Sequence, residues 1–232
     1  MLKSQFVSVI ITAAGAGSRM GTDGKLHLTI AGESVLSRTL TKFAKIEWLD
    51  ELILVVRKKE EEAVAALLAG LSFSCPVKMV EGGAERQDSI RNGLAVVDSR
   101  ASVVLTHDGA RPFVRTEDIR KVAEAVLAIP AAALAIPMTD TVKIVREDLS
   151  VVATPDRSTL WRVQTPQGFQ REILERAYEK AVREGISGTD DCSVVEKLGV
   201  PVQLIQGADT NIKITTRADL HFGEGIASEE EE

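Results

Sequence analysis

A glycine-rich stretch at residues 13–25 contains the residue types that bind an anion. It reads AAGAGSRMGTDGK, follows the apolar run VSVIIT, and carries two cations, Arg19 and Lys25. Glycines let main-chain N–H groups approach a phosphate closely, and the two side chains add full positive charges. We therefore predict a phosphate-binding loop here. The alternative is a strand-to-helix turn with solvated basic residues.

Two common phosphate-binding motifs do not fit this stretch. A Walker A loop requires Ser or Thr directly after Gly-Lys, but Leu26 follows Lys25, so no hydroxyl is placed for magnesium. The dinucleotide fingerprint G-x-G-x-x-G would begin at Gly15 and Gly17 and would need a third glycine where Met20 stands. Both motifs are excluded by spacing.

Strand patterns and helix patterns alternate along the chain, and the elements that they predict must position this loop. Apolar, β-branched runs predict strands at 7–12, 51–56, 77–81, 102–108, 132–137 and 202–206. Apolar residues at helical spacing follow most of these runs, as in 35–44 and 116–126. This order predicts an α/β fold of three layers around a mostly parallel, twisted sheet.

Local signals predict several helix ends. Gly70 and Gly185 stand where two helices should stop. Thr116 is the expected N-cap of one helix, and Thr189 is expected to open a short one. A last helical piece is expected near Ala218.

The alternation breaks at residues 139–157, where two β-branched runs flank a charged turn with no helix between them. This pattern predicts a β-hairpin. Because an isolated hairpin is marginally stable in water, it should pack on another surface, and a second copy of the chain is the simplest candidate. We predict one domain over residues 1–228, with 139–160 as a dimerisation arm and 229–232 as a solvated acidic tail.

Composition excludes several partners and sites. The chain has 232 residues, a net charge of −6 and only 4% aromatic residues, so neither a basic stripe nor a base-stacking platform for nucleic acid is expected. No run reaches the ~18 apolar residues of a membrane span, so no membrane partner is expected. Cys75 and Cys192 are far apart, which predicts reduced thiols and a cytoplasmic protein. The three histidines form no H-x-x-x-H pair, so a zinc site is not expected.

In open α/β sheets, ligands bind beyond the carboxyl ends of the strands. Four polar or glycine-rich segments follow predicted strands, and we expect them to line one cleft: residues 13–25, 81–89, 107–112 and 137–141.

Single residues in these segments are open to two interpretations. Asp108, with Gly109 giving close backbone access and Arg111 nearby, is either half of an internal ion pair or a substrate contact. Ser89 lies near a helix start, where a hydroxyl often only caps. Lys213 alternates with apolar neighbours in NIKIT and is expected to point into the cleft or into solvent.

Asp190 and Asp191 are adjacent carboxylates after Thr189. They could hold a metal ion or act as partners of a helix dipole, and we favour the dipole interpretation.

Nine segments, in order and spacing, resemble the 2-C-methyl-D-erythritol 4-phosphate cytidylyltransferase family over residues 9–220. They are AAGAGSRM, Lys25, GGAERQDS, HDGARP, DT at 140–141, TPDR at 154–157, TPQ at 165–167, TDD at 189–191 and NIKIT at 211–215. The resemblance implies a nucleotide-diphospho-sugar transferase fold, which is Rossmann-like, with a protruding β-arm and a homodimer joined through it. It also implies CTP and a polyol phosphate as substrates, and Mg²⁺ held mainly by the CTP phosphates.

The resemblance implies a role for each site residue. The first loop would bind the CTP phosphates through Ala13, Ala14, Gly15, Ala16 and Gly17. Arg19 and Lys25 would neutralise the charge on the triphosphate, and the cytosine would meet Gly83, Ala84 and Ser89.

The remaining implied roles concern the ribose and the second substrate. Asp108, beside Gly109, would lie by the ribose and the metal. Methylerythritol phosphate would be held by Arg111, Thr165 and Lys213 of one subunit and by Thr141 and Arg157 of the other.

Two alternatives remain open. A ribitol-5-phosphate cytidylyltransferase has similar loops, although the alanine before Arg111 favours methylerythritol because the sister group more often has valine there. A non-catalytic nucleotide-binding regulatory module would bind CTP without releasing pyrophosphate. The family's usual Gly-Gly-Asp reads Gly82-Gly83-Ala84 here, so a backbone contact would have to replace any aspartate contact with the base.

Overall fold

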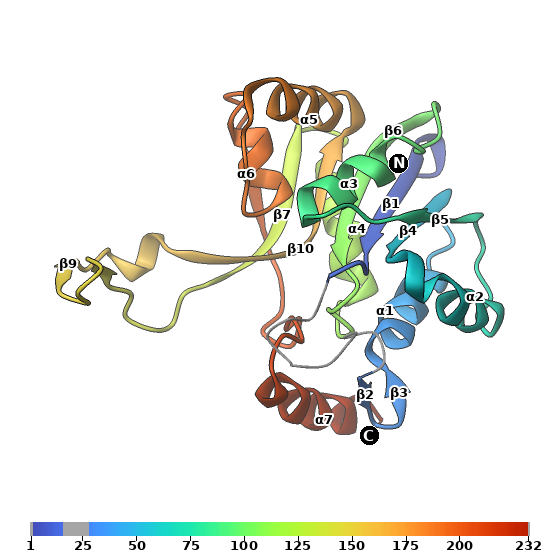
Figure 1. Ribbon diagram of the computed structural model, residues 1–232, viewed down its shortest axis with the longest axis horizontal. Coiled ribbons are helices and arrows are strands. Elements are labelled where there is room, and N and C mark those ends of the chain that lie inside the picture. The colour runs from blue at the N-terminus through green and yellow to red at the C-terminus, as the bar shows by residue number, and fades with distance from the viewer. Residues whose placement is uncertain (1, 16–27, 232) are drawn as a thin grey trace.

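A seven-stranded sheet forms the centre of the molecule in a computed structural model that describes residues 2–15 and 28–231. Its strand order is β11-β7-β10-β6-β1-β4-β5 (Figure 1). In chain order its strands are β1 (Phe6–Thr12), β4 (Glu51–Val56), β5 (Val77–Glu81), β6 (Ala101–Asp108), β7 (Ala131–Pro137), β10 (Trp161–Gln170) and β11 (Gln203–Gln206). The other strand pairs are β2 (Thr29–Ile30) with β3 (Glu33–Ser34), and β8 (Ile144–Val145) with β9 (Val151–Ala153).

Helices cover both faces of the sheet, which confirms the predicted three-layer α/β class (Figure 1). The α-helices are α1 (Val35–Ala44), α2 (Glu61–Ala69), α3 (Arg86–Leu94), α4 (Thr116–Ala125), α5 (Arg171–Glu184), α6 (Asp191–Glu196) and α7 (Arg217–Glu231). Short 3₁₀ turns are η1 (Leu2–Ser4), η4 (Lys58–Glu60) and η5 (Arg157–Thr159).

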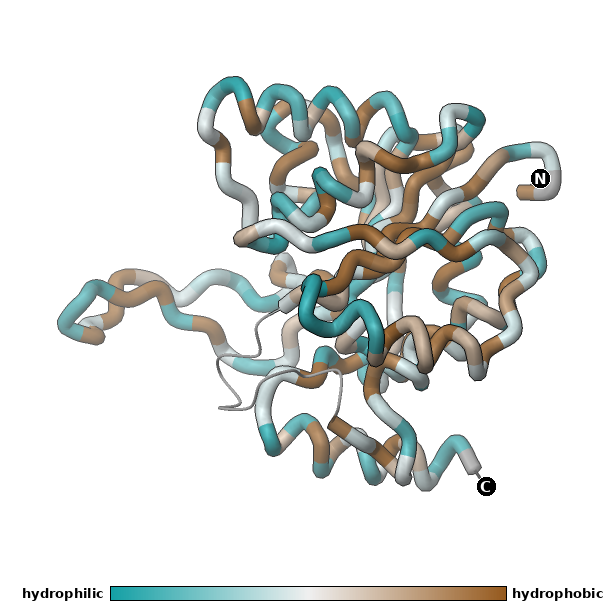
Figure 2. The backbone as a smooth tube through the Cα atoms, turned by 45° about the vertical axis from the view of Figure 1, so that its right-hand side comes forward, coloured by the Kyte–Doolittle hydropathy of each residue, from teal (hydrophilic) through white to brown (hydrophobic). Residues whose placement is uncertain are grey.

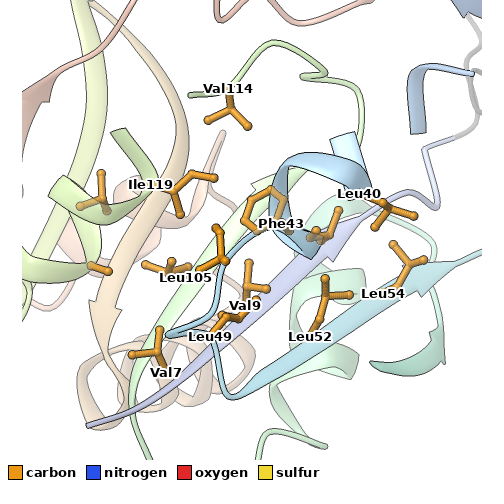
Figure 3. Packing of buried hydrophobic residues seen from close by; sticks show 14 of the residues in the cluster. Val7, Val9, Leu40, Phe43, Leu49, Leu52, Leu54, Leu105, Val114 and Ile119 are labelled. Atoms are coloured by element: carbon orange, nitrogen blue, oxygen red, sulfur yellow. The ribbon is translucent and has the colours of Figure 1, made fainter. Parts of the chain in front are cut away.

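One face of the sheet packs against α1, α2 and α4. Val9 of β1 and Leu54 of β4 belong to this core together with Leu40 and Phe43 of α1 and Ile119 of α4 (Figure 3). Strands buried on both faces read as continuous apolar runs, which is why β1 and β4 could be predicted from composition. Figure 2 shows these hydrophobic strands at the centre of the molecule.

The opposite face packs against α3, α5 and α6. Ile10 and Ile53, which alternate with the residues of the first core, meet Ile90 of α3 and Leu174 of α5 here. Side chains on a strand alternate between faces, so one apolar strand supplies both cores.

The C-terminal acidic residues are helical. Residues 229–231 continue α7, and Glu229 and Glu230 are exposed to solvent. Glu230 forms an ion pair of 2.8 Å with Lys42 of α1, and it lies 4.0 Å from Arg38. A small third core, including Ile30, Ile214 and Ala227, holds this helix in place.

Strand β10 was not predicted, and it runs antiparallel to both of its neighbours, β6 and β7. Its sequence, WRVQTPQGFQ, is polar at half of its positions and carries Pro166, so it lacks the apolar run of its neighbours. Its pairing with β7 is interrupted between Val163 and Gln167, and this irregular stretch contains Thr165. The sheet remains mostly parallel, as predicted.

The predicted hairpin is formed by β8 and β9, which pair antiparallel. The segment that contains them projects away from the sheet (Figure 1). Its strands are only two and three residues long, and their side chains are exposed.

The predicted helix ends were right at two positions and wrong at two. Gly70 and Gly185 are C-caps, and Gly185 adopts the left-handed conformation. Thr116 is the first helical residue of α4, and Arg115, not Thr116, is the N-cap. Asp190, rather than Thr189, caps α6, because its carboxylate accepts the Ser193 N–H.

Candidate active site

The carboxyl ends of the central strands meet at one edge of the sheet, as predicted. Main-chain hydrogen bonds at this edge join Ala13 to Val55 (2.8 Å), Gly82 to Val56 (2.8 Å), Gly109 to Thr12 (2.9 Å) and Ile214 to Ala110 (2.8 Å). The last of these bonds brings the C-terminal NIKIT segment beside the segment that follows β6. Residues from distant parts of the chain therefore lie around the end of β6.

Asp108, the last residue of β6, is the centre of a charged cluster. Its Oδ2 atom lies 3.0 Å from Nζ of Lys213 and 3.4 Å from Nε of Arg111. Its Oδ1 atom lies 3.3 Å from Nε of Arg86. The structure thus joins the predicted residues Asp108, Arg111 and Lys213, and adds Arg86 to them.

The charges of this cluster decide the state of Asp108. Burial alone would raise the pKa of Asp108, but Lys213, Arg86 and Arg111 together hold that pKa well below its usual range. The carboxylate is therefore ionised at neutral pH. Asp108 is only 8% exposed, whereas the Lys213 side chain is 37% exposed and is accessible to a ligand.

Thr165 connects β10 to this cluster from within the protein. Its hydroxyl accepts the N–H of Asp108 at 3.1 Å and lies 3.0 Å from Nδ1 of His107. On the other side of the ring, Nε2 faces the carbonyl oxygen of Arg111 at 3.4 Å. Since a carbonyl can only accept, we assign the proton to Nε2, so that Nδ1 accepts from the Thr165 hydroxyl.

His107 is fully buried in a core that also contains Phe43, whose ring centroid lies 4.9 Å from that of His107. Burial, together with the nearby Arg111 and Lys213, lowers the pKa of His107 to about 3, against the opposing influence of Asp108. The imidazole is therefore neutral near pH 7.

Arg111 is held by Asn211 as well as by Asp108. Its Nη1 atom donates to the Asn211 carbonyl at 2.7 Å, and the Asn211 side-chain amide donates to the carbonyl of Thr165 at 2.9 Å. The Oδ1 atom of Asn211 is buried and has no hydrogen-bond partner within the described ranges. Asn211 thus fixes the guanidinium of Arg111 near the cluster.

The glycines after β5 allow close packing of the segment predicted to meet the base. A Cβ atom on Gly82 would collide with Cβ of Ala14, and one on Gly83 would collide with Cβ of Asp88. The N–H of Gly83 donates to the Ser89 hydroxyl at 3.2 Å, and this hydroxyl donates to the Glu85 carbonyl at 3.1 Å. Ser89 is therefore buried and fixes the turn, while Ala84 is exposed.

Asp190 and Asp191 are both engaged by protein donors. Asp190 caps α6 through Oδ1, and its Oδ2 accepts from Gln167 at 2.6 Å. Asp191 is completely buried and pairs with Arg86. The dipole interpretation describes Asp190, whereas Asp191 has a different role that the sequence did not indicate.

The glycine-rich loop is described only in its first three residues. Ala16, Gly17, Arg19 and Lys25 lie outside the described residues. The N–H of Ala13 is used by the sheet, as given above, whereas Gly15 is exposed.

Thr141 and Arg157 do not join the cluster around Asp108. Both are exposed on the projecting segment (Figure 1). The guanidinium of Arg157 donates to the carbonyl of Thr139 at 3.0 Å, within the same segment.

The described part of the chain contains neither a protein-only metal site nor a membrane-spanning helix. Across residues 2–15 and 28–231, no group of three or more His, Cys, Asp or Glu side chains is arranged to hold a metal ion. Nor does any helix in these ranges have the length and apolar character needed to cross a bilayer.

A cavity of about 390 Å³ lies elsewhere, at the amino end of β6 and the start of α5. It is lined by residues that include Gln5, Ser102 and Arg171. None of the predicted site residues lines it, so we do not assign the site there.

Sequence reasoning did not single out Arg86 or Tyr178, whose hydroxyl donates to Asp191 at 2.6 Å, and it did not link Asp191 to Arg86. Arg86 follows a predicted strand end, so the rule that selected Asp108 could also have selected it. Asp191 and Tyr178 could not be linked to Arg86 from spacing, because the three residues lie on different helices.

Comparisons with known proteins identify the family of this chain. Residues 7–229 match the family model described as IspD, 2-C-methyl-D-erythritol 4-phosphate cytidylyltransferase. A curated protein of that name from Caldanaerobacter subterraneus subsp. tengcongensis is 43% identical over 220 residues, which cover 94% of this chain and 97% of the relative.

Solved structures show the same similarity. The 4-diphosphocytidyl-2C-methyl-D-erythritol synthase of Anaerococcus prevotii matches with a TM-score of 0.86 and 34% identity, covering 97% of this chain and 99% of that one. The 2-C-methyl-D-erythritol 4-phosphate cytidylyltransferase of Thermus thermophilus matches with a TM-score of 0.81 and 33% identity, covering 97% and 100%. With the charged cluster at the carboxyl edge of its sheet, this chain belongs to the 2-C-methyl-D-erythritol 4-phosphate cytidylyltransferase family of nucleotidyltransferases.

Proposed function

We propose that this enzyme transfers CMP from CTP to 2-C-methyl-D-erythritol 4-phosphate. A phosphate oxygen of the polyol phosphate attacks the α-phosphorus of CTP and forms a new P–O bond. The bond between the α-phosphorus and the bridging oxygen breaks, and pyrophosphate leaves. The product is 4-diphosphocytidyl-2-C-methyl-D-erythritol, an isoprenoid precursor.

The reaction needs no general base. A phosphate monoester has its second pKa near 6, so it is largely a dianion at neutral pH and is already nucleophilic. Catalysis then depends on alignment of the reacting groups and on neutralisation of negative charge. The surroundings of Asp108 suit this requirement, because they place Lys213 and Arg111 side by side.

The observation that carries the proposal is this pairing of two cations on one carboxylate. Asp108 orients both, and the partly exposed Lys213 can meet the phosphate of the polyol. The predicted CTP contacts, Gly15 and the segment 82–89, lie at the same edge of the sheet. Arg19 and Lys25 would bind the triphosphate from the loop between β1 and β2.

Magnesium would arrive with CTP. Asp108 supplies one carboxylate at this position, and its three neighbours are cations. These residues therefore cannot form a metal site without ligands from the substrate. One carboxylate plus substrate phosphates is, however, a usual environment for Mg²⁺. Asp108 would be the protein ligand, and the ion would neutralise charge on the CTP phosphates.

The arm supports a homodimer with shared sites. Its exposed apolar residues include Leu149, which is 78% exposed, and Val151, which is 55% exposed. Figure 2 shows hydrophobic stretches on this projecting segment. Exposed apolar surface of this kind marks an interaction site, and a second subunit would place Thr141 and Arg157 at the partner's polyol phosphate. A cytoplasmic location fits the two unpaired cysteines.

A pyrophosphate-release assay with CTP and a panel of polyol phosphates tests the reaction. We expect release with 2-C-methyl-D-erythritol 4-phosphate and at least tenfold less with ribitol 5-phosphate. Preference for ribitol 5-phosphate would overturn the assignment of the substrate. CTP binding without pyrophosphate release from any acceptor would overturn the assignment of the reaction.

A further inference from the structure

Arg86 bridges two carboxylates that lie on different elements. It is the first residue of α3, and its Nη1 and Nη2 atoms donate to Oδ1 and Oδ2 of Asp191, each at 2.8 Å. Its Nε group lies 3.3 Å from Oδ1 of Asp108. One planar guanidinium therefore connects the start of α6 to the end of β6.

Asp191 is fully satisfied by protein donors. Besides the two bonds from Arg86, its oxygens accept from the hydroxyls of Thr106 and Tyr178, both at 2.6 Å. Burial and the charge of Asp191 raise the pKa of Tyr178 well above its usual range, so this phenol remains a donor. A buried carboxylate with four donors has no capacity left for substrate or metal, and its effect is to fix Arg86.

The fixed guanidinium group of Arg86 sets the orientation of the Asp108 carboxylate. A bidentate guanidinium has one orientation relative to its carboxylate, so its Nε–H direction is set as well. Because Arg86 holds Oδ1 of Asp108, the other oxygen, Oδ2, faces Lys213 and Arg111. The ion pair of Arg86 with Asp191 is thus linked to Lys213 and Arg111 through one residue, Asp108.

The charge balance of the five groups also depends on Arg86. With Arg86 present, three cations face two carboxylates, so the cluster keeps a positive excess for a phosphate dianion. Without Arg86, the charges of Asp108 and Asp191 would cancel those of Lys213 and Arg111.

We propose that Arg86 is a positioning residue for the second substrate, held in place by Asp191 with Tyr178 and Thr106, and that it presets Asp108 so that Lys213 and Arg111 receive the polyol phosphate. This inference rests on the proposed function. It assigns to Arg86 no contact with a reacting atom.

The test uses the full-length enzyme with Arg86→Lys, which keeps the charge and loses the fork. We expect kcat/KM for 2-C-methyl-D-erythritol 4-phosphate to fall about tenfold in a protein that melts at a lower temperature but is folded at the assay temperature. If Arg86 acts through Lys213, then Arg86→Lys should cost little further activity in a Lys213→Met background. Additive losses in that double variant would overturn the proposal, because a merely structural role would act independently of Lys213.

A second variant avoids an unpaired buried charge. Arg86→Met combined with Asp191→Leu replaces the ion pair by apolar residues and should still fold. We expect the same loss of about tenfold or more, and wild-type kinetics in this variant would contradict the proposal. Arg171→Lys is the matched control, since Arg171 also forms a 2.7 Å ion pair, with Glu175, but lies at the other end of the sheet. It should keep full activity.

Calorimetric titration separates this inference from the proposed function. Binding of 2-C-methyl-D-erythritol 4-phosphate requires no turnover, so weaker binding to Arg86→Lys than to the wild type would support the positioning role even if pyrophosphate were not released. The wild type could be active while both Arg86 variants bind the substrate and turn it over as the wild type does. That result would overturn the positioning role and leave the proposed function intact.

Discussion

The Nζ atom of Lys213 lies 3.0 Å from Oδ2 of Asp108, and this ion pair joins the C-terminal segment to the end of β6. Lys213→Met should lower kcat/KM for the polyol phosphate by about 10–100-fold, because a hydrogen bond to a charged group contributes roughly 1.5–3 kcal/mol. Initial rates at varied polyol phosphate check this. Lys180→Met is the control, because Lys180 of α5 donates to the Lys197 carbonyl and has no bond to the cluster around Asp108, and equal rates in the two variants would argue against a role for Lys213.

Lys25 and Arg19 are expected to act on the triphosphate. Replacing either by alanine should lower kcat by about 10²–10³-fold while the protein stays folded, because each is expected to stabilise charge that develops during transfer. Single-turnover rates with CTP, alongside circular dichroism, give the measurement. The exposed Lys58→Ala variant should behave as wild type. Near-normal turnover in the Lys25 or Arg19 variant would remove its assigned role.

Arg157 is expected to act on the partner's substrate. Arg157→Ala should raise KM for the polyol phosphate, and mixing it with Lys25→Ala subunits should restore activity, because each mixed dimer then has one intact site. Activity after refolding or subunit exchange of the mixture is the measurement. Mixing Lys25→Ala with Lys213→Met is the control and should restore nothing, since both residues belong to the same subunit's share of a site. Absence of recovery in the first mixture would count against shared sites.

His107 should make stability depend on pH. Its pKa is about 3 in the folded protein and near 6.5 when unfolded, so the unfolded state binds the extra proton between these values. The contribution of His107 to the free energy of unfolding is therefore fully present above about pH 6.5. As the pH falls from there to about pH 3, this contribution is lost by up to about 1.4 kcal/mol per pH unit.

Urea unfolding between pH 7 and 5, above the range in which most carboxylates titrate, measures this slope. His107→Asn should flatten it, whereas the exposed His221→Gln variant should keep it. An unchanged slope in His107→Asn would show that another group is responsible.

Gly168 of β10 packs against α4 without room for a side chain. A Cβ atom there would lie 2.7 Å from Cγ1 of Val122 and 3.0 Å from Cδ2 of Leu105. Gly168→Ala should reduce the free energy of unfolding by about 1–3 kcal/mol through overpacking. Gly70→Ala is the control, because Gly70 has φ −85° and its Cβ would meet only the Leu67 carbonyl, at 3.5 Å. Denaturant unfolding of both variants measures the difference. Equal free energies of unfolding for Gly168→Ala and Gly70→Ala would contradict the packing argument.

The parallel strands and the candidate residues at their carboxyl ends could be predicted because their signals are local. The apolar runs of β1 and β4 reflect burial on both faces, and the rule for ligand sites then selects Asp108 and the residues near it. Strand β10 escaped prediction because its polar sequence acquires strand structure only by pairing with β6 and β7. The same holds for Thr165, whose link to His107 depends on that pairing.

The sequence by itself determined the fold class, the hairpin of β8 and β9 and the residue types around Asp108, since periodicity, turn residues and motif spacing are properties of neighbouring positions. Only the tertiary structure decided which cation faces which carboxylate. Arg86 could have been paired with any nearby acid, and its bidentate bond to Asp191 exists because α3 and α6 cover the same face of the sheet. Ion pairs between distant segments depend on packing geometry, which no local pattern encodes.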